Sequence, residues 1–235
     1  LASTSNLFAT TPVRCRTHVS VSAGLFDFSV LFAYLLLTPL IHTYYSMVMS
    51  YKLGMPHVKM FELLPEHLRR VDESDDAVFY SQPRIVKHID EPACTALTEY
   101  FRKMLPPNGE ILDLMSSCVS HLPEDIGYKK VVGLGMNQIE LEANSRLSSY
   151  LIQNLAVNPK LPFVNNSFDA CTLTVSVQYV VHPISVFQEI GRVLKPNRPC
   201  IVSFSNRCFP TKAVSIWHQL SDICLAQILS PCFEA

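Results

Sequence analysis

The chain has 235 residues, enough for one domain of ordinary size and an extension. Hydrophobic residues make up 49% of it and charged residues 17%, a balance that supplies a core and excludes global disorder. The formal net charge is −1, so the basic excess that usually accompanies nucleic-acid binding is missing. The eight cysteines form no C-x-x-C pair, which favours small buried hydrophobic side chains over a disulfide framework or a metal site.

The first residues have the composition of a targeting segment. Residues 1–26 contain no Asp or Glu, are rich in Ser and Thr, and carry Arg14 and Arg16. Organellar import favours such cationic, acid-poor segments, so we expect a transit peptide and a location in the chloroplast or another organelle. The alternative is an N-terminal stretch without a targeting role in a cytoplasmic protein.

A long uncharged segment follows, at residues 28–49, bracketed by Asp27 and Lys52. Its length suits a membrane-spanning helix, whereas Pro39 and His42 near its middle argue against one. Three interpretations stay open: a membrane helix, a hydrophobic element docked on the protein, and sequence outside the mature fold.

Residues 60–76 predict a short charged helix and then an acidic linker, which we take as a domain boundary. The expected organisation is therefore a transit peptide at 1–26, the hydrophobic segment and charged linker at 27–76, and one domain at 77–235.

Within that domain, Asp90 and Pro92 predict the start of a helix, because Asp caps helix N-termini and Pro fits the first turn. An apolar stripe at helical spacing continues to Leu105, and Pro106 stops it. Beyond this point β-type runs alternate with helical patterns such as the one at 184–194. The β-type runs are residues 110–114, 130–134, 150–152, 168–181 and 200–205. Such alternation predicts an α/β fold with a doubly wound, mostly parallel sheet.

Several motifs occur in a characteristic order: ILDL, VVGLGMN, LPFVNNSFDACTLTVSVQYVVHP and FQEIGRVLKPNRPCIVSFSN. This run resembles class I S-adenosylmethionine-dependent methyltransferases of type 11, and SFDA and EIGRVLKP are the most specific matches. DLMSS-x-VSHLP, GLGMN and FSNRCFPTKA are similar to a plant and cyanobacterial subgroup of methyltransferase-like proteins. The resemblance covers roughly residues 79–218. It implies a Rossmann-like sheet, S-adenosylmethionine as cofactor, and methyl transfer to an acceptor of unknown class.

The resemblance assigns cofactor binding to residues that follow the strands. They are Asp113, Met115, Ser116, Ser117, Gly135, Met136, Asn137, Asn154, Leu155, Ser176 and Gln178. Asp113 would help to hold the methionine end, and residues 115–117 match the glycine-rich loop. Asn154 and Leu155 would lie beside the adenine, and residues 176–178 under the sulfonium.

Two departures from the family pattern bear on cofactor binding. No glycine occurs between residues 110 and 126, although glycine lets a loop turn tightly and approach a ligand closely. Gly135 stands where the family has an acidic residue that accepts hydrogen bonds from the ribose, and Asn137 is expected to replace only part of that bonding. Both departures favour an alternative interpretation, in which the chain is a non-catalytic, methyltransferase-like protein that acts as a binding module or scaffold. In one form of this alternative the protein is attached to a membrane.

The sequence leaves the catalytic residues and the acceptor open. Tyr179, His182 and His121 are nearest to the expected site, but each suits a structural role, and no general base or metal ligand is assigned. A small molecule, a lipid, a quinone and a protein all remain as acceptors. An NAD-dependent enzyme is disfavoured because G-x-G-x-x-G is absent after the first strand.

The end of the chain predicts an incomplete sheet. Class I methyltransferases have two further strands after the fifth, whereas the residues after Trp217 predict one helix and a tail. Without that pair the strand at 200–205 is left as an edge of the sheet. Two outcomes stay open: the chain is a truncated product, or another element covers this edge.

Overall fold

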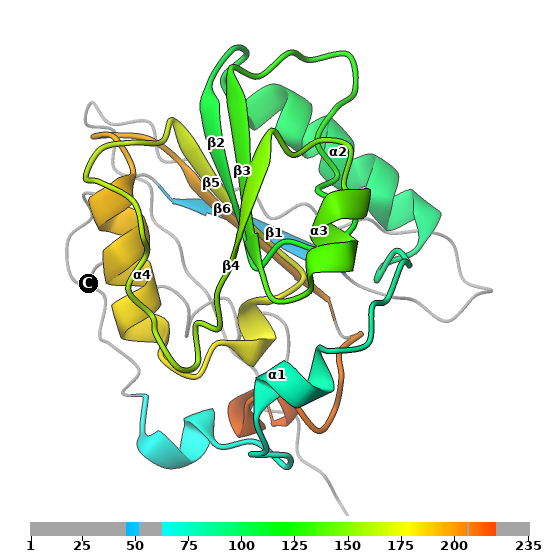
Figure 1. The fold of residues 1–235 in the computed structure, drawn as a ribbon, viewed down its shortest axis with the longest axis vertical. Coiled ribbons are helices and arrows are strands. Elements are labelled where there is room, and N and C mark those ends of the chain that lie inside the picture. Colours follow the sequence, from blue (N-terminus) through cyan, green and yellow to red (C-terminus); the bar gives the residue numbers. More distant parts are fainter. Residues whose placement is uncertain (1–45, 52–62, 206, 220–235) are drawn as a thin grey trace, which may run out of the picture.

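The computed structural model describes residues 46–51, 63–205 and 207–219; the expected transit peptide and residues 28–45 lie outside them. The described residues form a six-stranded sheet in the order β1-β6-β5-β2-β3-β4 (Figure 1). The strands are β1 (Ser46–Tyr51), β2 (Glu110–Leu114), β3 (Lys130–Gly135), β4 (Ser149–Ile152), β5 (Ala170–Thr174) and β6 (Cys200–Ser205). Strands β2 to β6 are parallel, and β1 alone runs antiparallel, beside β6.

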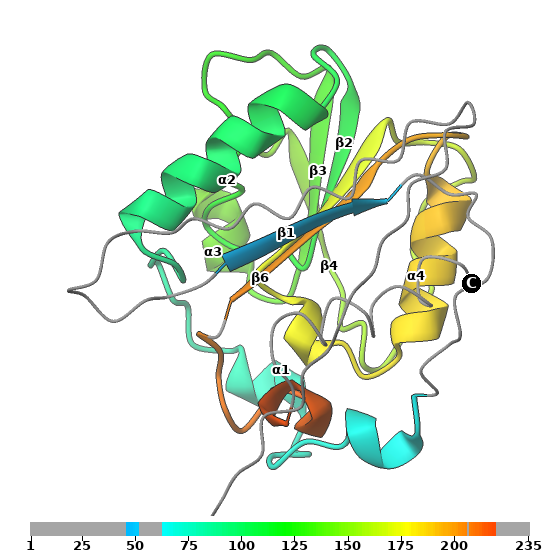
Figure 2. The same ribbon diagram turned by 180° about the vertical axis from the view of Figure 1, so that it is seen from behind.

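Helices cover both faces of the sheet, which confirms the doubly wound α/β fold. The helices are α1 (Asp76–Phe79), α2 (Glu91–Met104), α3 (Gln138–Ala143) and α4 (Pro183–Val193), with 3₁₀ turns at Pro65–Leu68, Val177–Tyr179 and Ser215–His218. Figures 1 and 2 show α2 and α4 on opposite sides of the sheet. Phe187 and Ile190 of α4 pack with one face, and Leu97 and Phe101 of α2 with the other.

The local signals for α2 act as expected. The Asp90 carboxylate accepts a hydrogen bond from the Ala93 backbone N–H at 3.0 Å, which caps the helix. The predicted strand at 168–181 was wrong in length, because β5 ends at Thr174. Val175 has φ 50°, a left-handed conformation that a β-branched residue seldom adopts, and the chain then enters a 3₁₀ turn.

The edge of β6 is covered, which is the second of the two outcomes that the sequence analysis left open. Residues 46–51 pair along its whole length, from Ser46 opposite Ser205 to Tyr51 opposite Cys200. The last four residues of the uncharged segment at 28–49 therefore belong to the sheet. Among the described residues, no helix has the length and hydropathy needed to cross a membrane.

A buried ion network fixes the segment before α1 against the loop after β6. Lys212 is fully buried, and its Nζ lies 3.1 Å from Asp76 and 3.2 Å from Asp72. Arg70 donates two hydrogen bonds of 2.9 Å to Asp76. In the described part of residues 60–76, the expected short helix is the 3₁₀ turn at Pro65–Leu68, and a stretch without regular structure follows it up to α1.

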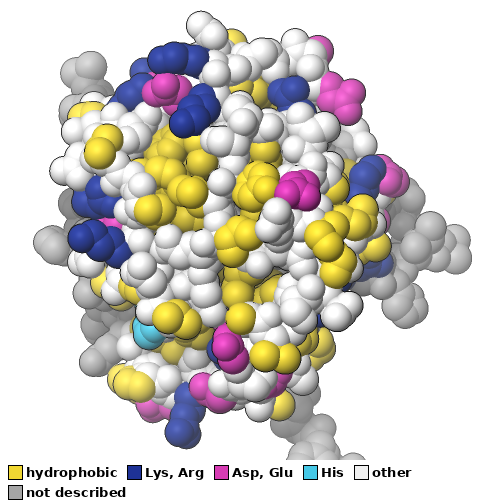
Figure 3. All heavy atoms as spheres, viewed as in Figure 1, with side chains coloured by type: hydrophobic (Ala, Val, Ile, Leu, Met, Phe, Trp, Pro, Cys, Tyr) yellow, Lys and Arg dark blue, Asp and Glu magenta, His cyan; other side chains and the backbone are white. Residues whose placement is uncertain are grey.

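The surface in Figure 3 shows hydrophobic side chains gathered on the face that carries α4 and β4, with charged side chains mostly toward the rim. Exposed hydrophobic residues of β4 and the loop after it include Leu151, Ile152 and Val157.

Candidate active site

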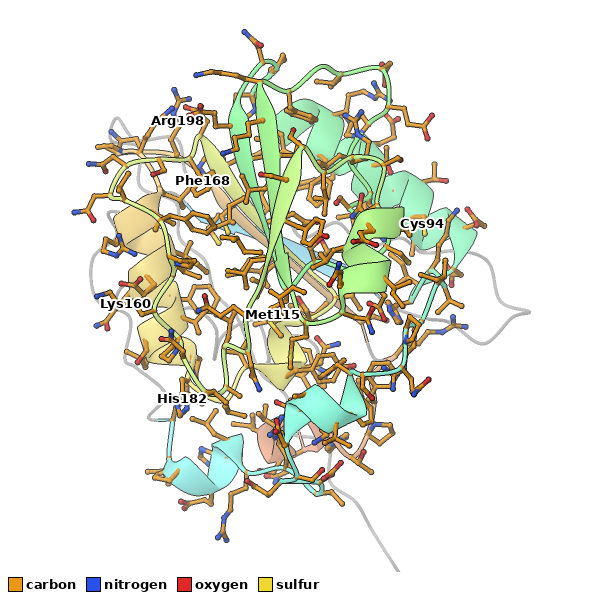
Figure 4. All side chains as sticks on the ribbon, in the orientation of Figure 1. Cys94, Met115, Lys160, Phe168, His182 and Arg198 are labelled. Atoms are coloured by element: carbon orange, nitrogen blue, oxygen red, sulfur yellow. The ribbon has the colours of Figure 1, made fainter. Side chains whose placement is uncertain are left out.

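The carboxyl ends of the parallel strands meet at one edge of the sheet, where ligands bind in folds of this kind. A cavity of about 300 Å³ lies there. All predicted cofactor-binding residues except Gln178 line it, as do His121 and Tyr179. Figure 4 shows Met115 beside the ends of the strands, whereas His182 lies near the start of α4, away from Met115. His182 does not line the cavity; its Nε2 lies 3.1 Å from the Ala156 carbonyl oxygen.

Asp113 anchors the loop that follows β2. Its carboxylate is buried and accepts hydrogen bonds of 2.6 Å from both Ser116 Oγ and Ser120 Oγ. Thr172 Oγ1 donates a third bond of 3.1 Å from the neighbouring strand β5. Burial raises the pKa of this carboxyl, and the three hydroxyl donors oppose the shift. Asp113 thus holds the serines in place of a glycine-rich turn.

The loop turns sharply without glycine. Met115 and His121 both have φ 55°, the left-handed conformation that glycine usually supplies. The Ser116 backbone N–H donates to the Leu134 carbonyl at 2.8 Å, which holds the turn against β3. Each left-handed residue costs about 1 kcal/mol or more. The missing glycine therefore does not prevent the turn; it makes the turn strained.

Gly135 is required by this close approach. A Cβ atom built there would lie 2.3 Å from the Ser116 carbonyl oxygen, so no acidic side chain fits at this position. The Asn137 side chain is already committed: its oxygen accepts from the Glu140 N–H, and its nitrogen donates to two carbonyls of the Tyr80–Ser81 pair. The Asn137 oxygen keeps one lone pair for a ligand hydroxyl, so the expectation that it replaces only part of the carboxylate's bonding stays a prediction.

Glu140 is the carboxylate that the sequence analysis missed. It is buried, lines the cavity from the first turn of α3, and accepts hydrogen bonds from Ser117 Oγ at 2.6 Å and the Arg84 backbone N–H at 2.7 Å. Glu140 lies three residues after Asn137, which caps α3. An acidic residue at that spacing is common at helix N-termini, so the sequence did not mark Glu140 as a site residue.

The residues after β4 form a turn on another wall. Asn154 Oδ1 accepts from the Ala156 N–H at 2.9 Å, and its Nδ2 has no hydrogen-bond partner among the described residues. Leu155 beside it is buried. This wall therefore offers one amide donor group next to an apolar surface.

The floor of the cavity carries polar groups without partners. Thr174 and Ser176 line the cavity, and their hydroxyl oxygens are buried and form no hydrogen bond with the described residues. A buried unpaired hydroxyl costs about 1–3 kcal/mol, so these atoms suit a polar ligand. Gln178 is not part of the lining: its Nε2 donates to the Val175 carbonyl at 3.0 Å, while its Oε1 is buried and has no hydrogen-bond partner within the described ranges.

Segments remote in sequence close the remaining side. Tyr80 and Arg84 after α1, His88, and Phe209 after β6 line the cavity together with Tyr179. The sequence analysis missed the first four, although Phe209 lies in the FSNRCFPTKA motif that it singled out.

Burial makes His121 and Tyr179 poor general bases at neutral pH. Burial lowers the pKa of His121 to about 4 and raises that of Tyr179 to about 12. The Tyr179 hydroxyl also accepts a hydrogen bond of 2.8 Å from the Phe209 N–H, which joins two walls of the cavity. At neutral pH His121 is therefore uncharged and Tyr179 keeps its proton.

One family model matches part of the chain. Residues 117–202 match the family model described as a methyltransferase domain. No curated protein matches the chain.

Solved structures match the chain in part. An S-adenosylmethionine-dependent methyltransferase from Mesorhizobium loti has 22% identity, a TM-score of 0.34, and coverage of 42% of this chain and 48% of its own. A Pyrococcus horikoshii protein has 22% identity, a TM-score of 0.39, and coverage of 53% and 64%. Geranyl diphosphate C-methyltransferase from Streptomyces coelicolor, solved with S-adenosylhomocysteine, has 19% identity, a TM-score of 0.34, and coverage of 45% and 40%. The chain thus spans about half the length of the structures it matches.

Proposed function

We propose that this protein, which has the class I methyltransferase fold and S-adenosylmethionine as its cofactor, transfers the sulfonium methyl group to an acceptor bound in the same cavity. The observation that carries the proposal is that Thr174 and Ser176 line a cavity at the carboxyl edge of the sheet with buried hydroxyls that have no hydrogen-bond partner among the described residues. Unsatisfied polar atoms in such a place suit a polar ligand.

The chain's residues divide the work of binding. The loop held by Asp113 and the turn at Asn154 would enclose the cofactor, with Thr174 and Ser176 as hydrogen-bond partners beneath it. Glu140 supplies carboxylate oxygens that still have free lone pairs toward the cavity.

The chemistry asks little more of the protein. The cofactor supplies an electrophilic methyl group, so the protein contributes mainly orientation of the acceptor and exclusion of water. Tyr80, Tyr179 and Phe209 supply apolar walls on the acceptor side. We therefore assign catalysis to the orientation of the acceptor between these walls and the residues Thr174 and Ser176.

The test is calorimetric titration of S-adenosylhomocysteine into the full chain. We expect saturable micromolar binding, about two- to tenfold weaker in Thr174→Val, because one hydrogen bond is lost. Thr95→Val is the matched control, since Thr95 is exposed on α2 and its hydroxyl bonds to the Glu91 carbonyl. A folded protein that binds no S-adenosylhomocysteine would refute the proposal and favour the scaffold alternative.

We also propose that the protein belongs to the plant and cyanobacterial subgroup and is imported into a chloroplast or other organelle. The support is the acid-free composition of residues 1–26 and the motif FSNRCFPTKA. A fusion of residues 1–62 to a fluorescent protein in plant cells should accumulate in the organelle; a cytoplasmic signal equal to that of the unfused reporter would refute this.

A further inference from the structure

Aromatic rings from three segments form one wall of the cavity. Tyr179 and Phe209 stack with ring centroids 5.8 Å apart and planes inclined by 30°. Tyr80 meets Phe209 edge-on at 6.4 Å, and Phe79 meets it at 5.3 Å. The rings of Tyr80, Tyr179 and Phe209 are half-buried, and aromatic side chains that line a cavity bind planar molecules by stacking or edge-on contact.

A cation stands over the same rings. The Arg84 guanidinium lies 5.0 Å from the Phe209 ring centroid and 4.7 Å from that of Phe79. Its N–H groups reach the carbonyls of Phe79 at 3.1 Å and Gln82 at 3.3 Å. A guanidinium has five N–H donors, so further donors remain. In the described part of the chain no carboxylate forms an ion pair with Arg84, in contrast to Arg70, which pairs with Asp76.

The surrounding titratable groups leave Arg84 as a positive site. Asp76 is neutralised by Arg70 and Lys212, and burial lowers the pKa of His88, which disfavours a second positive charge there. Glu140 also lines the cavity and would repel an anion near it. An anionic ligand is therefore expected on the Phe209 side of Arg84.

We propose that the methyl acceptor is a planar molecule with a carboxylate group, stacked among Tyr80, Tyr179 and Phe209 and held by Arg84 through that carboxylate. The inference rests on the proposed function, since it names the acceptor class of that site. Arginine suits the task because its planar fork binds both oxygens of a carboxylate. Under this proposal, neutral lipids and quinones are not the methyl acceptor.

The probe is benzoate, titrated into the full chain with and without S-adenosylhomocysteine and followed by saturation-transfer NMR. Benzamide has the same ring without the charge, and cyclohexanecarboxylate has the charge without a planar ring. We expect benzoate to bind at least about tenfold more tightly than either, and Arg84→Met to remove the preference over benzamide. Arg84→Lys keeps the charge but not the fork and should fall between them.

The matched control is Arg198→Met. Arg198 pairs with Asp169 at 3.4 Å, and Figure 4 shows it at the opposite end of the sheet from Met115. Circular dichroism checks that each variant is folded, and the ligand comparison on the unmodified protein decides the matter if Arg84→Met does not fold.

The outcomes separate the two proposals. If S-adenosylhomocysteine binds but benzoate binds no better than benzamide, the acceptor class is wrong and methyl transfer stands. If benzoate binding depends on Arg84 but S-adenosylhomocysteine does not bind, the carboxylate site stands and methyl transfer is wrong. If neither ligand binds a folded sample, both proposals fail.

Discussion

Introducing at position 135 the acidic residue that is usual in the family should damage this protein. The Cβ atom of Gly135→Ala or Gly135→Asp would lie 2.3 Å from the Ser116 carbonyl oxygen, so the loop must retreat by roughly 1 Å. That movement breaks the 2.8 Å bond from the Ser116 N–H to Leu134 and strains the bond from Ser116 Oγ to Asp113. Two hydrogen bonds at about 1 kcal/mol each, plus about 1–3 kcal/mol for overpacking, give a loss of about 3–5 kcal/mol.

The measurement is urea unfolding of the full chain, with thermal unfolding as a second readout. The expected loss lowers the melting temperature by roughly 10 °C for a domain of this size. Gly127→Ala is the control, because a Cβ at Gly127 meets nothing within 4 Å. Equal stability of Gly135→Ala and Gly127→Ala would show that the loop does not lie against β3 as described.

Three further changes test other parts of the structure. Met115→Gly should be about 1 kcal/mol more stable than Met115→Ala in urea unfolding, because φ is 55° at this position. An equal or reversed order of stability would contradict the backbone strain inferred at Met115. Lys212→Met should cost about 3 kcal/mol, because it removes one of the cations that pair with the buried Asp76 carboxylate. Lys87→Met, at an exposed ion pair, should leave the free energy of unfolding nearly unchanged, and equal losses in the two variants would contradict the buried network. His121 has a folded pKa of about 4, below its unfolded value, so its contribution is present above about pH 6.5 and is lost as pH falls toward 4. Unfolding at pH 7 and pH 4 should show the unmodified protein losing about 2 kcal/mol more than His121→Asn, and parallel losses would refute the assignment.

Local signals predicted the frame of the fold. The β-type runs at 110–114 and 200–205 became β2 and β6 with the same bounds, because buried parallel strands have continuous apolar sequences. Asp90 marked the start of α2 because its carboxylate caps a free N–H. Asp113 and Ser176 could be placed at one edge because parallel strands end together.

The sequence could not predict features that depend on long-range packing. The run at 168–181 is rich in β-branched residues, and nothing in it marks Val175 as left-handed. Arg84 and Phe209 are far apart in the chain, so their contact over the cavity has no local pattern. The residues of β1 are apolar in a way that suits a helix and a strand equally.

The pairing of β1 with β6 also sets an order of events during synthesis. Residues 46–51 emerge from the ribosome long before residues 200–205, their partners in the sheet. Until β6 is made, this apolar segment lacks its partner strand in the sheet. An unpaired strand of this kind is prone to pair with other chains and aggregate. The outermost position of the sheet on this side can therefore be filled only once β6 has been synthesised. Contacts of such high sequence separation form slowly, so docking of β1 is expected to be a late step in folding.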